Sequence, residues 1–136
     1  TERDDGRVRA DMPGGWPGDK VNAFSGAGLT PEQREMQDWT RRLFNWRRKA
    51  TVSHEGALMQ YAPLEGCYVF FRYGGGRTVM VVLNKNAKPV ELALARFGER
   101  LAAGDAARDV LDGREFKLGA TLAVPARSPL VLEIAR

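Results

Sequence analysis

The apolar positions of this chain follow two different periods, and the change lies near residue 57. From residue 57 onward, short runs rich in aromatic and β-branched residues are separated by turn residues, which is typical of antiparallel strands. Before that point, between residues 31 and 48, apolar side chains recur every three or four residues, at Met36, Trp39, Leu43 and Trp46. This spacing places them on one face of a helix. The pattern predicts one amphipathic helix followed by an all-β module.

The predicted helix carries signals at both ends. Thr30 is a suitable N-cap, Pro31 fits the first helical position, and Gln33 completes a capping box with Thr30. Basic residues gather toward its end: Arg41, Arg42, Arg47, Arg48 and Lys49. The helix dipole favours cations there. We therefore interpret the basic cluster as a solvated helix end, and we do not expect a nucleic-acid partner.

The all-β module is predicted from runs of strand-forming residues. These runs span residues 58–61, 67–73, 78–84, 90–94, 109–111, 115–118, 120–124 and 129–134, with a short helical piece near 96–101. The run 78–84 is nearly all apolar, which predicts a central strand buried on both faces. Asp112-Gly113 predicts a two-residue hairpin turn. Short strands with frequent turns predict an antiparallel β-sandwich, with Tyr68, Phe70 and Phe116 at core positions.

The N-terminal stretch, residues 4–19, follows neither period. Gly and Pro punctuate it, and carboxylates, guanidinium groups and Trp16 are interleaved at short intervals. A charged, aromatic loop on a rigid support is a common place for binding residues. Terminal segments of this composition are also often frayed. From the residues alone, both interpretations stay open.

Composition narrows the chemistry. The chain has 136 residues, of which 43% are hydrophobic, a size and composition typical of one compact domain, and no apolar run approaches the roughly 20 residues that span a bilayer. We expect no membrane partner. Cys67 is the single cysteine and His54 the single histidine, so no disulfide or Cys/His zinc set is predicted. The aspartates Asp4, Asp5, Asp11 and Asp19 lack the spacing of an EF-hand, and no metal or cofactor is predicted.

The order of these parts resembles the C-terminal end of an α-amylase-type enzyme of glycoside hydrolase family 13, in the neopullulanase and cyclomaltodextrinase branch. A charged loop with Gly, Pro and Trp is followed by a Trp-rich helix and then by a small sandwich. The residues that carry the resemblance are Arg9 to Asp19, Asn22-Ala23-Phe24, Leu43 to Arg48 and Val124-Pro125-Ala126.

The resemblance implies a division of the chain at about residue 52. Residues 1–52 would be the end of a (β/α)8 barrel, with an active-site loop over 1–29 and the last barrel helix over about 30–48; residues 53–136 would be the C-terminal sandwich. A barrel needs about 250 residues, and no segment here matches the family's catalytic Asp, Glu and Asp. We therefore expect a non-catalytic fragment whose sandwich stabilises the barrel of an enzyme that hydrolyses α-1,4-glucosidic bonds by a retaining mechanism.

The resemblance also implies substrate contacts in the loop. Family members often carry an Asp-x-x-x-Arg pair there that contacts sugar hydroxyls, and Asp5 and Arg9 fit this spacing. A carboxylate accepts from hydroxyls and a guanidinium donates in a fixed fork. Trp16 would add an apolar face for a sugar ring. The implied partners are the parent's barrel and an α-glucan, with a homodimer through the exposed helix face as a further option.

Two other functions remain as alternatives: a starch- or carbohydrate-binding β-sandwich module, and, behind it, a nucleic-acid-binding protein that uses the basic helix end. His54 is interpreted as a linker residue and Cys67 as a buried small hydrophobe. The cellular location stays unknown, with a periplasmic or extracellular site slightly ahead of a cytoplasmic one, because one cysteine says little about compartment.

Overall fold

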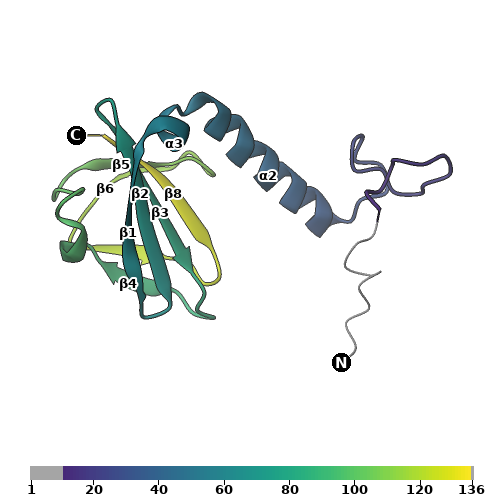
Figure 1. Ribbon diagram of the computed structural model, residues 1–136. Helices are drawn as coiled ribbons and strands as arrows, with labels where there is room; N and C mark the ends of the chain where they lie inside the picture. The colour runs from purple at the N-terminus through teal and green to yellow at the C-terminus, as the bar shows by residue number, and fades with distance from the viewer. Residues whose placement is uncertain (1–10, 136) are drawn as a thin grey trace. The chain divides into compact units, whose positions relative to one another are not determined.

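The computed structural model describes residues 11–135 (Figure 1). Two compact units divide within the long helix α2 (Pro31–Lys49): the first ends at Arg41 and the second begins at Arg42. In the described residues, the first unit contains a loop and the start of α2. The second contains the end of α2, the short helix α3 (Val52–Glu55) and the strands.

The strands form two antiparallel sheets. The larger sheet has six strands in the order β1-β2-β3-β8-β5-β6, and the smaller pairs β4 with β7. The bounds are β1 Ala57–Leu64, β2 Cys67–Gly74, β3 Arg77–Asn84, β4 Val90–Ala93, β5 Ala106–Asp109, β6 Glu115–Lys117, β7 Thr121–Val124 and β8 Pro129–Ala135, with a 3-10 turn η1 at Ala95–Phe97. The predicted fold class, an antiparallel β-sandwich preceded by a loop and one amphipathic helix, is confirmed.

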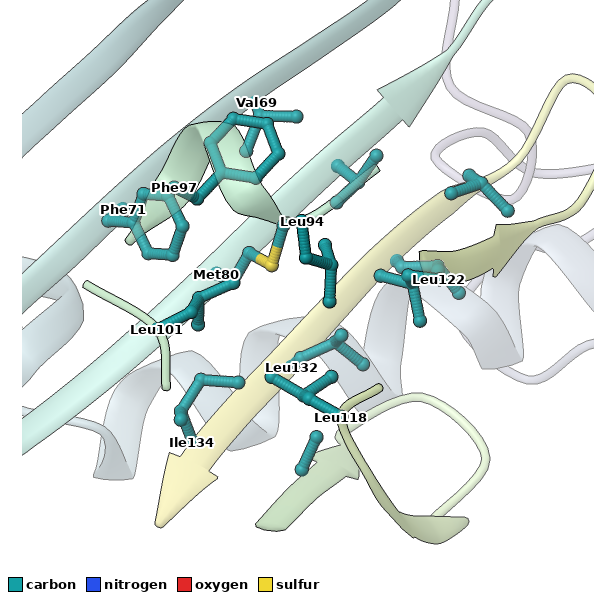
Figure 2. Close-up of a cluster of buried hydrophobic side chains, with 14 residues drawn as sticks. Val69, Phe71, Met80, Leu94, Phe97, Leu101, Leu118, Leu122, Leu132 and Ile134 are labelled. Carbon is teal, nitrogen blue, oxygen red and sulfur yellow. The ribbon is translucent and has the colours of Figure 1, made fainter. Parts of the chain in front are cut away.

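The main core lies between the two sheets (Figure 2). Register pairs Phe71 with Met80 and Val69 with Val82 on the neighbouring strands β2 and β3, so these four side chains form one continuous surface. Phe97 of η1 packs over it, with its ring centroid 6.0 Å from that of Phe71. Each such side chain contributes about 1.5–3 kcal/mol when it is fully buried. The smaller sheet and η1 together close this core.

The larger sheet is also apolar on its other face, which we call the outer face. Successive residues of a strand point to opposite faces, so Val79 and Val131 lie on the side away from the main core. There they pack against α3 and against Leu43 and Trp46 of α2. The indole N–H of Trp46 donates to the Glu133 carboxylate at 2.8 Å. Apolar contact and one charge-assisted hydrogen bond therefore fix the end of α2 to the sheet.

The start of α2 follows its sequence signals. The Thr30 N–H donates to the Gln33 side chain at 2.9 Å, and the Gln33 N–H donates to the Thr30 hydroxyl at 3.3 Å. The predicted capping box is confirmed. The last turn holds Arg47, Arg48 and Lys49, where the helix dipole favours positive charge.

Two of the predicted elements have different bounds in the structure. Residues 58–61 were predicted as a short strand, but β1 runs over Ala57–Leu64 because it resumes its pairing with β2 after an irregularity between Tyr61 and Leu64. The helical piece predicted near 96–101 is the three-residue turn η1, which begins one residue before this range and ends at Phe97.

The predicted two-residue hairpin at Asp112-Gly113 was also wrong. Strand β5 ends at Asp109 instead of covering 109–111, and Arg108 pairs with Glu115. The cause is Asp109, whose N–H donates to the Arg114 carbonyl at 2.9 Å and whose carboxylate accepts from the Leu111 N–H at 2.9 Å. This side chain stabilises a longer turn than the Asp-Gly signal indicates.

Two of the three aromatic residues predicted in the core lie elsewhere. Tyr68 and Phe70 are half-buried on the outer face, paired with Leu83 and Val81 of β3. Phe116 is partly buried and packs against the main core. The predicted burial of residues 78–84 on both faces holds only in part, because Leu83 is 42% exposed.

Candidate functional site

The described part of the N-terminal loop, residues 11–29, is organised around two polar side chains. The first is Asp19, whose carboxylate accepts from the Gly14 N–H at 2.7 Å and the Trp16 N–H at 3.2 Å. The Asp19 N–H donates in turn to the Trp16 carbonyl at 3.3 Å. A carboxylate that accepts two backbone N–H groups holds a turn in one conformation. Asp19 is therefore committed to the loop's own structure.

The second organising residue is Asn22. Its side-chain oxygen accepts from the N–H groups of Phe24 and Ser25, each at 2.9 Å. The side chain of Gln37, on α2, donates to the carbonyl of Ala23. Within the first unit, the loop is thus tied both to itself and to the helix that follows it.

Close packing explains two glycines of this loop. Gly14 has φ +94°, and a Cβ there would lie 2.6 Å from the side chain of Asn22. Gly28 has φ +72°, and a Cβ there would lie 2.5 Å from the carbonyl oxygen of Lys20. Positive φ and lack of space both favour glycine at these positions.

The indole of Trp16 is the predicted substrate contact that the structure describes. It is 65% exposed on the turn that Asp19 holds, and Met12 and Phe24 are exposed on the same loop. Chemically, an exposed indole offers a flat apolar face with one N–H donor. Asp5 and Arg9 lie outside the described residues, so their predicted pairing on a sugar stays a prediction.

The shifted pKa values in the described residues have local structural causes. Burial raises the pKa of the Cys67 thiol, with a smaller contribution from Glu65, and burial likewise raises the pKa of Tyr61. Burial raises the pKa of the Asp109 carboxyl more than its backbone hydrogen bonds lower it. Hydrogen bonds at the start of α2 lower the pKa of Glu32. Cys67 is a buried thiol, as predicted.

Other candidate chemistry is limited across residues 11–135. No three His, Cys, Asp or Glu side chains there are grouped so that they could hold a metal ion. No helix in this range has both the length and the apolar character to cross a membrane. The ring of His54 lies with Nε2 2.6 Å from the Arg47 carbonyl oxygen, and Arg72 donates to the His54 carbonyl at 2.9 Å. His54 thus helps to join α2 to the sheet.

A second surface was missed from the sequence: the part of the outer face that α2 and α3 leave uncovered. Leu58 is 53% exposed there, and Phe70 is half-buried. At its end lies an open hollow of about 600 Å³, whose lining includes Tyr68, Leu83, Lys85, Arg127 and Pro129. The signal was present in the sequence, because the outward positions of β2 and β3 are apolar apart from Arg72 and Arg77.

Comparison with solved structures shows which proteins share this fold. An α-amylase from Anoxybacillus aligns over 79% of this chain at 18% identity, with a TM-score of 0.64. An α-amylase from Geobacillus thermoleovorans, solved with acarbose, aligns over 80% at 14% identity, with a TM-score of 0.60. An isomaltulose synthase mutant from Erwinia rhapontici NX5 aligns over 81% at 13% identity, with a TM-score of 0.58. The fold is therefore that of the β-sandwich region of α-amylase-type enzymes.

The family follows from a second comparison. Residues 58–133 match the model of the Cyclo-malto-dextrinase C-terminal domain, and the chain belongs to this family. The resemblance to the C-terminal region of an α-amylase-type glycoside hydrolase is confirmed. The chain spans only 26%, 24% and 22% of the three solved chains named above, about a quarter of their length.

Proposed function

We propose that this chain is the non-catalytic C-terminal part of an enzyme that hydrolyses α-1,4-glucosidic bonds in cyclodextrins, pullulan or maltooligosaccharides. The observation that carries the proposal is the match of residues 58–133 to the Cyclo-malto-dextrinase C-terminal domain. The small share of each aligned amylase that this chain covers supports a longer parent polypeptide.

Catalysis would come from the preceding part of that polypeptide. Retaining glycoside hydrolysis uses two carboxyl groups about 5–5.5 Å apart, one as nucleophile and one as acid and then base. By the resemblance, these groups and an orienting Asp stand on earlier barrel strands. The contribution of this chain would be to bind: Asp5 accepts from sugar hydroxyls, Arg9 donates to them, and Trp16 offers its exposed face to a sugar ring.

The sandwich would act as a support for the barrel. The end of α2, proposed as the last barrel helix, packs through Leu43 and Trp46 on the outer face. The hydrogen bond from Trp46 to Glu133 adds a directional contact.

The test compares the 136-residue chain with the complete parent polypeptide on maltooligosaccharide, cyclodextrin and pullulan. We expect turnover from the complete polypeptide and none from the chain alone. Clear turnover by the 136-residue chain would refute its non-catalytic role. A folded parent that is inactive on all three substrates would refute the substrate class.

The role of Trp16 is tested in the complete polypeptide by Trp16→Ala, with Phe24→Ala as the matched control. Both aromatic side chains are exposed on the same loop, but only Trp16 is proposed to contact sugar. Loss of about 1–2 kcal/mol of binding would lower kcat/KM roughly 5–30-fold for Trp16→Ala. Equal effects of the two substitutions would remove Trp16 from the substrate site.

One observation favours the alternative of a carbohydrate-binding module. Tyr68 lies half-buried in the lining of the outer-face hollow, and its hydroxyl donates to Gln60 at 2.7 Å, which fixes the ring. A fixed aromatic ring beside an open hollow can serve as a platform for a sugar ring. Titration of the 136-residue chain with β-cyclodextrin decides: saturable binding that Tyr68→Ala abolishes favours the module, and no binding leaves the supporting role.

A further inference from the structure

A pocket lies between the end strand of the larger sheet and the smaller sheet. Strand β1 ends the larger sheet, and β4 pairs with β7 in the smaller one. The pairing of β1 with β2 is irregular between Tyr61 and Leu64. At this irregularity, residues of β1, β2, β4 and η1 enclose part of a pocket of about 180 Å³. The pocket therefore leads from the side of the sandwich toward the main core.

The deep part of this pocket is apolar. Cys67 and Val69 lie two positions apart on β2, so their side chains point to the same face of the sheet, toward the main core. These two residues and Phe97 line the pocket and are 3%, 4% and 1% exposed. Burial raises the pKa of the Cys67 thiol, so the thiol is protonated near neutral pH. We call this surface the pocket floor.

The rim of the pocket is charged. Glu65, Glu91 and Arg96 line it and are exposed. The Arg96 guanidinium donates to the carbonyl of Ala62 at 3.0 Å, and its central carbon lies 5.6 Å from the centroid of the Tyr61 ring. These contacts join η1 to β1 and hold the guanidinium at the rim. A guanidinium has five N–H groups, so the bond to Ala62 leaves donors for an acceptor on a bound molecule.

We propose that this pocket binds a small uncharged aromatic molecule that carries one hydrogen-bond acceptor, such as an aryl ketone. The ring would lie on the pocket floor, and the acceptor would receive a hydrogen bond from Arg96 at the rim. The pocket contains none of the residues to which the proposed function assigns a contact with substrate. The proposed hydrolytic function therefore stands or falls independently of this site.

Size and charge define the class of ligand. A cavity of about 150 Å³ lined by Leu, Ile and Phe accepts benzene, whereas drug-sized ligands occupy pockets of about 300 Å³ or more. The volume of about 180 Å³ therefore fits one ring with a short substituent. Two carboxylates and one guanidinium at the rim disfavour an anion. A sugar is disfavoured because its hydroxyls would be buried against the apolar floor without hydrogen-bond partners.

The test uses Cys67 as a reporter, because it lines the pocket and is the single cysteine of the chain. Modification of its thiol by methyl methanethiosulfonate is followed by mass spectrometry in the 136-residue chain. A buried thiol must wait for local opening, and a ligand that binds the closed state slows the reaction by a factor of 1 + [L]/Kd. For acetophenone we expect a Kd of about 0.1–1 mM. At ten times this Kd, modification should be about tenfold slower.

Two substitutions locate the ligand. Val90→Phe adds a ring to the pocket lining from β4 and should abolish protection by acetophenone. Its matched control is Val110→Phe, because Val110 is also half-buried but packs on the outer face, and this variant should keep the protection. Arg96→Met removes the donor and should weaken acetophenone binding about tenfold. Binding of ethylbenzene, which lacks the carbonyl, should not change in Arg96→Met.

Equal rates of Cys67 modification with and without acetophenone in the folded wild type would overturn the site. Equal protection of Val90→Phe and the wild type would overturn its location. Benzoate and maltose at the same concentrations test the ligand class, and protection by either that matches acetophenone would overturn the assignment to an uncharged aromatic molecule. If Val90→Phe does not fold, Leu92→Phe, which also lines the pocket from β4, replaces it.

Discussion

Asn84 holds two connections together at one end of the sandwich, the one from β3 to β4 and the one from β7 to β8. Its replacement measures what this polar network contributes to stability. Its side chain is 5% exposed. Its Nδ2 donates to the carbonyl of Pro125 at 2.9 Å and, at longer range, to those of Lys88 and Val124. Its Oδ1 accepts from the N–H and from the side chain of Asn86, each at 2.9 Å. The loops that flank β4 and β7 are thereby held to the end of β3.

The magnitude follows from these contacts. Each intramolecular hydrogen bond contributes about 0.5–1.5 kcal/mol net, and buried carbonyls left without a donor add to the loss. Asn84→Ala should therefore destabilise the domain by about 2–4 kcal/mol. The matched control is Asn45→Ala on the exposed side of α2, which should change the free energy of unfolding by no more than about 0.5 kcal/mol.

Asn84→Asp adds a pH dependence with a definite sign. The carboxylate keeps the shape of the amide but cannot donate, so it would face the carbonyl oxygens of Pro125, Lys88 and Val124 in a site with little water. Burial and these dipoles should raise the pKa of the new carboxyl above the usual value of about 3.9. A raised pKa in the folded state gives stability at low pH that is lost as pH rises. The deficit of this variant should therefore grow from about pH 4 toward neutrality.

The assay is urea unfolding followed by circular dichroism, at about pH 4 and pH 7, with the wild type, the two Asn84 variants and the Asn45→Ala control measured together. The reasoning about the network is refuted if Asn84→Ala is as stable as Asn45→Ala. The electrostatic part is refuted separately if the deficit of Asn84→Asp is the same at both pH values.

Three further predictions concern the same domain. Trp46→Phe should destabilise it by about 1 kcal/mol through the lost hydrogen bond to Glu133. A double-mutant cycle with Glu133→Leu should show that the effects of the two substitutions are not additive. Additive effects would contradict the contact. Asp109→Asn should gain stability relative to the wild type as pH rises above 3.8. The pKa of Asp109 is raised in the folded state, so the contribution of its carboxyl group to the free energy of unfolding falls as pH rises. Parallel pH profiles of the two proteins in urea unfolding would contradict this. Gly56→Ala should destabilise the domain by about 1–3 kcal/mol, because a Cβ there would lie 2.5 and 3.0 Å from two backbone oxygens. The control is Gly98→Ala, whose Cβ would meet only an ordinary contact at 3.5 Å. Equal thermal midpoints for the two variants would refute the clash.

The features that the sequence predicted best depend on neighbouring residues. The capping box of Thr30 and Gln33 forms because both residues lie within one helical turn. The sandwich class followed from short apolar runs between turns, which need no knowledge of pairing. The hairpin at Asp112-Gly113 was mispredicted because the side chain of Asp109, three residues earlier, competes for the turn's N–H groups.

The candidate site was less accessible to sequence reasoning. Asp5, Arg9 and Trp16 were selected through the family resemblance, since a carboxylate, a guanidinium and an indole in a glycine-rich loop have many possible uses. Only the structure shows that the Asp19 carboxylate accepts hydrogen bonds from the N–H groups of Gly14 and Trp16. Asp19 therefore stabilises the loop itself.

The misplacement of Tyr68 and Phe70 has a different cause. Alternation assigns a strand's residues to inside and outside only when one side is polar. In β2 the outward set holds two aromatic residues beside Arg72, so the pattern gave only a weak signal about which set faces the main core, and pairing with β3 decides it. A strand that is covered on both faces carries apolar residues on both, so its sequence shows little alternation of apolar and polar residues. The ambiguity that defeated the prediction is therefore a property expected of a sheet whose second face is also covered, and here α2 and α3 cover part of that face.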